Sequence, residues 1–243
     1  MLLKACINGP RLPAGHPALP VTADGLAAEA AATVAAGAGA VHLHVKDDGG
    51  RDTLAAEPVA TVLHAVRRAV PATPLGLTTG AWALPDPLAR RDAVASWTEL
   101  PDFASVHWHE EGADDVAAAL LELGVGVEAG LWHGDAVARW ADSPHRDRCL
   151  RVLLELPDGP DAEQTRALAE GLLTAVGAVG SPAPLLLHGE GSSAWPALRL
   201  AGELGLDTRI GLEDTLVLPD GAPAPGNAAL VAAALAVLGP GRA

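Results

Sequence analysis

Two histidines separated by a single residue, His42 and His44, lie in the apolar run AVHLHVKDD at residues 40–48. Alternate side chains of a β-strand point to the same face, so both imidazoles would lie on one side of a strand. Histidine is not a preferred core residue. Two imidazoles about 6.5–7 Å apart along a strand can instead converge on a metal ion. The spacing therefore indicates a metal site.

A second group of ionisable residues lies in RIGLEDTL at residues 209–216. Glu213 is a candidate third ligand, because two histidines and one carboxylate leave an open position, as in catalytic zinc sites. Asp214 is then free to act as a base. Arg209 can hold a carboxylate substrate, or it can orient an acid and keep Asp214 ionised. Structural alternatives stay open: two hydrogen-bonded core histidines, a helix N-cap at Asp214, and an interior ion pair at Arg209.

Short apolar runs alternate along the chain with longer Ala- and Leu-rich segments of helical period. The expected strands cover residues 3–8, 40–46, 73–80, 102–108, 125–130, 149–156, 183–189 and 208–214. The expected helices lie near residues 22–37, 55–69, 86–97, 112–123, 134–142, 161–177, 194–204 and 227–238, with N-cap chemistry at Thr22 and Asp161. Eight strand–helix units predict one α/β domain over residues 1–243, a (β/α)8 TIM barrel, with a doubly wound open sheet as the competing arrangement.

The alternation of side chains along these strands predicts which residues face the barrel lumen. At every second position the strands carry apolar residues that suit contact with the helix layer. The residues at the positions between them become polar towards the C-terminal ends of the strands. The expected inward-facing residues are Cys6, Asn8, His42, His44, Lys46, Thr78, Glu128, His188, Arg209 and Glu213. Barrel enzymes carry their chemistry at this end. In a closed barrel, strands two and eight flank strand one, which brings Glu213 towards the histidine pair.

The composition limits the classes of partner. The chain has 16 Lys and Arg against 30 Asp and Glu, a formal net charge of −14, so we expect no nucleic-acid ligand. We expect a cytoplasmic protein with no membrane partner, because no run approaches the roughly 20 apolar residues of a span and no secretory signal is visible. Cys6 and Cys149 lack the spacing of a disulfide framework or metal site and are expected in the core.

Several motifs carry a family resemblance: ACINGPR, HPALPVTADGLAAEAAATVAAGAGAVHLHVKD, LTTG, GVGVEAGLW and TRIGLEDTLVLPDGAPAPGNAALV. Over nearly its whole length the chain resembles the β-keto acid cleavage enzymes, which are zinc-dependent (β/α)8 proteins. The order and spacing of HLHVKD and GLEDTL are fairly specific for that family. The resemblance implies that a β-keto acid and the co-substrate acetyl-CoA give acetoacetate and a new acyl-CoA.

The resemblance also implies roles for individual residues. His42, His44 and Glu213 match ligands of the Zn²⁺ cofactor. Asp214 and Arg209 match a catalytic acid/base pair, and Glu128 matches an active-site glutamate on the fifth strand. The substrate-binding positions that it implies are Thr78, Thr79 and Gly80 for the substrate carboxylate and Asn8 for the distal end of the substrate.

The stretch SVHWHEEG on the fourth strand departs from the family pattern, which more often has an Asn and a small hydroxyl residue at His107 and His109. His107 has the inward parity of Ser105 and is a candidate to contact the substrate, act as an acid or add a metal ligand, with a rim histidine as the structural alternative. The chain is also short for the family, so we expect trimmed loops. The Gly-x-Gly in LLHGEG at 186–191 is a weak indication of a phosphate contact.

Three rival functions stay open. A metal-dependent hydrolase of the amidohydrolase type also has an HxH pair, but on its first strand. A Schiff-base aldolase would use Lys46, which we expect to pair with Asp47 or Asp48. A catalytically silent barrel would bind metal or act as a scaffold. We also expect a homo-oligomer, with a tetramer favoured, because the helices that carry Trp97 and Trp195 have apolar surfaces suited to subunit contacts.

Overall fold

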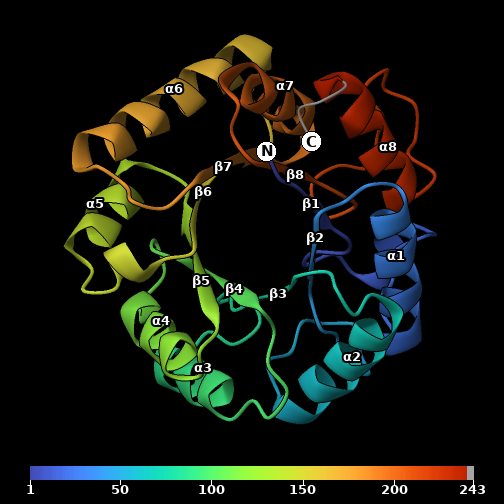
Figure 1. Ribbon diagram of the computed structural model, residues 1–243, viewed down its shortest axis with the longest axis vertical. Coiled ribbons are helices and arrows are strands. Elements are labelled where there is room, and N and C mark those ends of the chain that lie inside the picture. Colours follow the sequence, from blue (N-terminus) through green and yellow to red (C-terminus); the bar gives the residue numbers. More distant parts are fainter. Residues whose placement is uncertain (240–243) are drawn as a thin grey trace.

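Eight parallel strands form the inner ring of the computed structural model, which describes residues 1–239, and eight α-helices surround them (Figure 1). The strands are β1 (Leu3–Cys6), β2 (Ala40–Leu43), β3 (Leu75–Thr78), β4 (Phe103–His107), β5 (Gly126–Leu131), β6 (Arg151–Leu156), β7 (Leu185–Gly189) and β8 (Thr208–Ile210). The helices are α1 (Ala23–Ala35), α2 (Ala56–Ala69), α3 (Pro87–Ala95), α4 (Ala113–Glu122), α5 (Gly134–Asp142), α6 (Ala162–Val179), α7 (Ala194–Leu204) and α8 (Asn227–Leu238). Three short 3₁₀ helices were not expected: Pro13–Gly15, Arg146–Arg148 and Gly191–Ser193.

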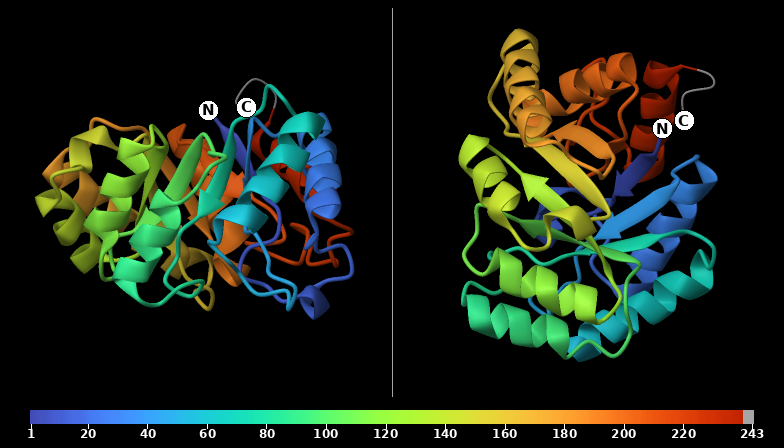
Figure 2. Two further views of the ribbon diagram at one scale, coloured as in Figure 1. Left: turned by 90° about the horizontal axis from the view of Figure 1, so that it is seen from below. Right: turned by 60° about the vertical axis from the view of Figure 1, so that its left-hand side comes forward.

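The strand order confirms the predicted (β/α)8 barrel. The hydrogen-bonded order is β7-β6-β5-β4-β3-β2-β1-β8, with each strand parallel to its neighbours. The ring closes between β7 and β8 through backbone bonds from Leu187 N to Asp207 O (2.9 Å) and from Asp207 N to Leu185 O (3.2 Å). Figure 2 shows the helices wrapped around the strands from two further directions. An open doubly wound sheet is therefore excluded.

The two predicted N-caps lie where the sequence chemistry requires them. The Thr22 hydroxyl accepts a hydrogen bond from Gly25 N at the start of α1. Asp161 and Gln164 form a reciprocal capping box at the start of α6. Such caps satisfy N–H groups that the first turn of a helix leaves without partners. They fix the points at which the chain leaves the C-terminal end of the barrel and enters these two helices.

Five strands, β1, β2, β3, β4 and β8, end earlier than predicted, and the differences in β2 and β8 affect the placement of polar residues of the site. Residues 208–214 were expected as a strand, but β8 ends at Ile210 because Asp214 N and Thr215 N both turn back to Gly211 O, at 2.9 and 3.0 Å. Residues 40–46 were expected as a strand, but β2 ends at Leu43. Glu213 and His44 therefore lie just beyond their strands, on the rim where barrel enzymes build active sites.

The main apolar core lies between the strands and the helices. There, buried Val, Leu and Ala side chains of the predicted outward parity pack against the inner faces of the helices. Trp97 and Trp195 belong to this core, at 4% and 6% exposure, so the two indoles themselves offer little surface for subunit contacts. Their indole N–H groups donate to Leu54 O and Val217 O. Within residues 1–239, no helix has the length and apolar character needed to cross a membrane.

Candidate metal centre and active site

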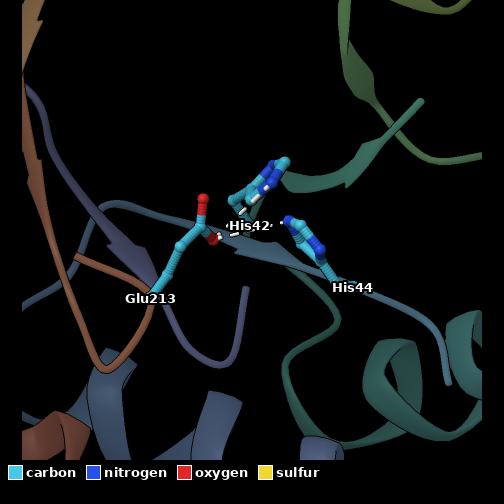
Figure 3. Close-up of side chains that lie close together, drawn as sticks. All are labelled: His42, His44 and Glu213. Carbon is cyan, nitrogen blue, oxygen red and sulfur yellow. Dashed lines mark ion pairs between the residues drawn. The ribbon is translucent and has the colours of Figure 1, made fainter. Parts of the chain in front are cut away.

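His42, His44 and Glu213 converge at the C-terminal end of the barrel (Figure 3). Nε2 of His42 lies 3.9 Å from Oε2 of Glu213, and Nε2 of His44 lies 3.7 Å from the same oxygen. One ligand atom from each residue lies within 4.8 Å of the other two, and all three side chains are buried or nearly so. Strand β1 separates β2 from β8, as predicted, so residues far apart in sequence meet across one strand.

The geometry of this triad fits a divalent cation. Ligands at about 2.0–2.1 Å in a tetrahedral site lie roughly 3.3–3.4 Å from one another, and the nitrogen–oxygen distances here are only slightly longer. Glu213 Oε2 is buried and has no hydrogen-bond partner among residues 1–239. A buried carboxylate oxygen without a partner is costly, and a bound metal ion would satisfy it.

Asp52 lies behind the triad and sets the orientation of His44. Its Oδ2 is 2.7 Å from Nδ1 of His44, and a carboxylate can only accept, so Nδ1 carries the proton and Nε2 presents its lone pair to the triad. The other oxygen of Asp52 accepts from Lys46 Nζ at 2.5 Å. The expectation that Lys46 pairs with Asp47 or Asp48 is therefore wrong, because the chain turns back after β2 and brings Asp52 to the lysine.

Arg209 bridges the two neighbouring carboxylates. Its Nη2 donates to Glu213 Oε1 (2.9 Å) and to Asp214 Oδ1 (2.8 Å), and its Nε donates to the same Asp214 oxygen (3.0 Å). Burial raises the pKa of Glu213, but Arg209, His42 and His44 outweigh it and hold that pKa well below its usual range. Glu213 is thus an ionised carboxylate, as a metal ligand requires.

Opposing influences act on the pKa of Asp214. Burial raises the pKa of Asp214 to about 7, and the charge of Glu213 adds to this effect, against the lowering influence of Arg209. The charge and hydrogen bonds of Arg209 lower this pKa, as expected from the sequence, and the complete burial of the carboxyl opposes them. The side-chain hydrogen bonds of Asp214 go to Arg209, and its Oδ2 has no partner among the described residues. The alternative of a helix N-cap is not realised.

A polar wall lies across the pocket from the triad. His107 Nε2 on β4 is 3.4 Å from Glu155 Oε1 on β6, and His188 Nε2 on β7 is 3.3 Å from the other Glu155 oxygen. Gly130 on β5 makes room for this group, because a Cβ there would overlap both Glu155 and His107. Burial raises the pKa of Glu155, but His107 and His188 hold it well below its usual range. The wall therefore carries an ionised carboxylate held between two imidazoles.

A cavity of about 180 Å³ separates the triad from this wall. It is lined by Pro10, His42, His44, Thr78, Trp82, Ser105, His107, Trp132, Glu155, Glu190, Arg209 and Glu213. Its volume is room for a keto acid of a few carbons beside the triad, and not for a long acyl chain.

Comparison with known proteins identifies the family. The family model described as beta-keto acid cleavage enzyme matches residues 1–139 and 145–239. The chain belongs to the beta-keto acid cleavage enzyme family. Among solved structures, the binary complex of ObcA with oxaloacetate superposes with a TM-score of 0.65 at 20% identity, covering 89% of this chain and 62% of that one. The ternary complex of ObcA with a C4-CoA adduct and oxalate superposes with a TM-score of 0.65 at 21% identity, again covering 89% of this chain and 62% of that one.

The solved structures support the barrel fold rather than a particular activity. (S)-3-O-geranylgeranylglyceryl phosphate synthase from Thermoplasma acidophilum, a protein of different chemistry, matches with a TM-score of 0.53 at 9% identity over 98% of this chain and 93% of its own. The present chain spans about 62% of the length of the ObcA chains that it matches. Family membership therefore rests on the sequence match, and the fold on the superpositions.

The structure brings some predicted substrate-binding residues to the cavity and holds others away. Thr78 and His107 line it. The Thr79 hydroxyl donates to Ser105 O at 2.7 Å, and Gly80 N donates to the Thr78 hydroxyl at 3.2 Å, so both groups are used within the β3 rim. Thr78 alone of the Thr-Thr-Gly segment therefore presents its side chain to the cavity.

Asn8 and Glu128 do not line the cavity. The Asn8 amide donates to His44 O and Pro20 O and accepts from His44 N, so it fixes the backbone of a triad residue rather than meeting a substrate. Glu128 is fully buried between Lys4 Nζ (2.5 Å) and Arg151 Nη1 (2.6 Å). Its inward parity was predicted correctly, but it lies deeper in the lumen than the cavity, with both oxygens paired.

Several residues of the site were not predicted from the sequence. Asp52 and Trp82 lie in loops after β2 and β3, where no periodicity sets side-chain direction. Glu155 had a usable signal, because it has the inward parity of Arg151 and stands near the C-terminal end of its strand. Trp132 and Glu190 directly follow β5 and β7.

The Gly-x-Gly after β7 does not form a phosphate site. Asp158 from the loop after β6 accepts from Ser192 N at 2.8 Å and from Gly159 N at 2.9 Å. A Cβ at Gly191 would overlap the same carboxylate. The N–H group that a phosphate would use at this turn is thus occupied by a side chain of the protein itself.

Proposed function

We propose that the protein is a zinc-dependent β-keto acid cleavage enzyme that condenses a β-keto acid with acetyl-CoA to give acetoacetate and a new acyl-CoA. The observation that carries the proposal is the convergence of His42, His44 and Glu213 in a chain of this family. The ObcA complexes add support, because a keto acid and a CoA adduct are bound by proteins of the same fold.

Zinc suits this donor set, because two imidazole nitrogens and one carboxylate with an open position are typical of catalytic zinc sites. Bound there, zinc would polarise the keto oxygen of the substrate and stabilise the negative charge that develops on it. Asp52 contributes by fixing the tautomer of His44. Arg209 contributes by holding Glu213 through Oε1, which leaves Oε2 directed to the two histidines.

The protein groups around the triad divide the remaining tasks in this proposal. Asp214 is buried beside Arg209 and does not itself line the cavity, so it would act from behind the lining residue Arg209. It takes the acidic carbon-bound proton of the substrate at Oδ2, which has no hydrogen-bond partner among the described residues, while Arg209 holds Oδ1. The Thr78 hydroxyl binds the substrate carboxylate from the β3 side of the cavity. His107 contacts the distal part of the substrate from the opposite wall.

The carbanion that results from this proton transfer to Asp214 attacks the thioester carbonyl of acetyl-CoA, which forms a carbon–carbon bond and releases the CoA thiolate. The thiolate then adds to the original keto carbon, and the bond between that carbon and the carbanion carbon breaks as in a Claisen condensation run in reverse. This cleavage gives the new acyl-CoA and the acetoacetate enolate, which takes the proton back from Asp214.

Two rival chemistries fit the geometry less well. The HxH pair is on β2 and its carboxylate partner follows β8, whereas an amidohydrolase-type barrel has this pair on its first strand. A Schiff-base lysine must be free to deprotonate. Lys4 is paired with Glu128, and Lys46 is held by Asp52 and the carbonyl of Gly9. Both lysines of the chain are therefore committed to ion pairs.

Turnover of a panel of short β-keto acids with acetyl-CoA tests the proposal. Acetoacetate and the new acyl-CoA, separated by chromatography and identified by mass, should form together in equal amounts. His42→Ala should abolish both products, and Leu168→Ser on the exposed face of α6 is the matched control that should retain them. Metal-loaded protein that yields neither product from any short keto acid would overturn the proposal.

We also propose a homo-oligomer, with a tetramer favoured. Exposed leucines on the outer helices, such as Leu88 on α3 and Leu204 on α7, offer apolar surface for subunit contacts. Light scattering tests this directly. A mass near that of one chain, 24.5 kDa, would refute it.

A further inference from the structure

Trp82 forms a fixed wall of the cavity. Its indole stacks on His44, with ring centroids 6.0 Å apart and an interplanar angle of 12°, and its centroid lies 5.2 Å from that of His107. Its Nε1 donates to Asp52 Oδ2 at 2.7 Å. A Cβ at Gly80 would overlap the six-membered ring, so glycine at this position lets the indole lie across the end of β3. Trp82 is thus held from three sides although it is 45% exposed.

An outer groove of about 510 Å³ begins on the far side of this indole. Its lining residues are Pro10, Leu12, Asp47, Arg51, Asp52, Thr53, Trp82 and Ala83. Pro10 and Trp82 also line the metal cavity, so the two spaces meet at these side chains. Leu12, 58% exposed, and Trp82 are two of the most exposed large apolar residues among those described, and both present their surface to this groove. Apolar surface next to a catalytic cavity indicates a ligand contact.

We propose that this outer groove binds the pantetheine arm of the thioester co-substrate and that Trp82 separates the arm from the keto acid. The inference rests on the proposed function for the identity of the co-substrate. The arm is an uncharged chain of methylene and amide groups, which matches a groove lined by the apolar Leu12 and Trp82 and by the hydroxyl residue Thr53. Because the groove meets the cavity at Pro10 and Trp82, a thioester at the end of the arm would reach the keto acid past the indole.

The charges beside the groove favour the arm over the nucleotide end of the thioester. Asp47 Oδ1 accepts from Gly49 N (2.8 Å) and Arg51 N (2.9 Å), and its other oxygen lies 3.5 Å from the Arg51 guanidinium. Asp52 is engaged by His44, Lys46 and Trp82. Arg51, whose side chain is 78% exposed, is the arginine that lines the groove, and it already faces a carboxylate. We therefore expect the phosphates to contribute little and to lie in solvent.

A larger hollow of about 780 Å³ between α1 and α2 is a poorer candidate for the arm. None of its lining residues also lines the metal cavity. Asp48 and Glu57 add to the negative charge of Asp47 along its wall. These carboxylates would repel a phosphorylated ligand, and a thioester seated there would not meet the triad.

Calorimetric titration of the metal-loaded full-length chain with acetyl-CoA and with S-acetylpantetheine tests the groove without requiring turnover. Leu12→Ser should weaken binding of both thioesters by roughly three- to ten-fold, the range expected for losing a partly buried leucine contact. Leu168→Ser, at another exposed leucine on α6, should leave both affinities unchanged. The affinity of acetyl-CoA should vary little with salt, since few cations meet its phosphates.

The outcomes separate the groove from the proposed reaction. Equal thioester affinities in wild type and Leu12→Ser, or no thioester binding to the wild type, would overturn the groove assignment. Weaker thioester binding by Leu12→Ser, with unchanged binding by Leu168→Ser, supports the groove assignment. This result keeps its meaning even if no keto acid is turned over. In that case the proposed function fails and the groove assignment stands. In steady-state kinetics of an active enzyme, Leu12→Ser should raise KM for acetyl-CoA and leave KM for the keto acid unchanged.

Discussion

Asp52 Oδ2 lies 2.7 Å from Nδ1 of His44 and 2.7 Å from the indole nitrogen of Trp82, so one carboxylate oxygen orients both a metal-binding imidazole and the wall beside it. Burial raises the pKa of Asp52, but its hydrogen bonds and charge interactions with His44 and Lys46 outweigh burial and lower it. The carboxylate is therefore ionised and able to accept from both donors.

Asp52→Asn should weaken metal binding without removing a ligand. An amide can present its NH₂ group to His44 Nδ1 and favour the other tautomer, which places the proton on Nε2. Substitutions of this kind typically cost about 10–100-fold in metal affinity. Competition with a chromophoric chelator measures the loss. Asp47→Asn, on the same loop but directed at Gly49 N and Arg51 N, is the control and should retain wild-type affinity.

Glu213 and Asp214 are adjacent, and their substitutions should differ in kind. Glu213→Gln removes a charge from the triad and should lower the zinc content of purified protein, because charged oxygen ligands bind the metal more tightly than amides. Asp214→Asn should retain zinc and fold but lose turnover by about 10²–10⁴-fold, the usual cost of removing a general base. Elemental analysis and steady-state kinetics on both variants measure the two effects.

Arg209→Ala links these two residues and should impair both functions. It removes the donors that hold Glu213 Oε1 and Asp214 Oδ1, so kcat should fall on the same scale as in Asp214→Asn and zinc affinity should also fall.

An Asp214→Asn protein with unchanged turnover would show that the base is misassigned. Full activity in chelator-stripped wild type would remove the metal from the mechanism.

The sequence was sufficient to predict the barrel and the triad because both depend on periodicity. Alternating apolar runs of strand and helical period give the eight units, and side-chain parity puts His42 on the inside of β2. His44 and Glu213 reach the same place although they lie just beyond the strands that were expected to carry them. Parity does not give height along the barrel axis. Glu128 therefore faces inward as predicted, but it lies level with Lys4 and Arg151, below the cavity.

The loops could not be predicted in the same way. Asp52 and Trp82 reach the site through turns whose side-chain directions no repeat sets, so neither was predicted. Asn8 was expected to meet the distal end of the substrate, but its amide is used by the backbone of His44, which lies just beyond the end of β2. The pKa of Asp214 depends on its complete burial behind Arg209, which a sequence pattern does not reveal.

Glu128 should prove important for stability rather than turnover. Glu128→Gln leaves the buried Lys4 without its countercharge and removes one of the two carboxylates that pair with Arg151, which keeps Asp207, and breaking a buried pair costs on the order of 3 kcal/mol. The melting temperature should therefore fall by about 6–12 °C, whereas turnover by the folded protein at low temperature should change by less than about threefold. Glu203→Gln, which removes an exposed partner of Arg166, is the control and should cost at most about 1 kcal/mol. If turnover by Glu128→Gln instead fell by about a hundredfold or more, the catalytic role that the family resemblance implied would be supported.

The His107–Glu155 pair should make stability depend on pH in a defined direction. Burial lowers the pKa of His107, but Glu155 and Glu110 outweigh burial and raise it above the ordinary 6.5. A raised pKa in the folded state contributes stability that is fully present below the unfolded value and is lost as pH rises through the folded value. The depressed pKa of Glu155 acts at the other end of the pH range. Its contribution to the stability of the fold is present at neutral pH and is lost only as the pH falls into strong acid.

The stability difference between wild type and His107→Gln should therefore be larger at about pH 6 than at about pH 9, as measured by denaturant unfolding at fixed metal concentration. His64→Gln, at an exposed histidine of α2, is the matched control and should show no such trend. A difference that stays constant or grows with pH would mean that His107 is neutral beside Glu155 in the folded protein.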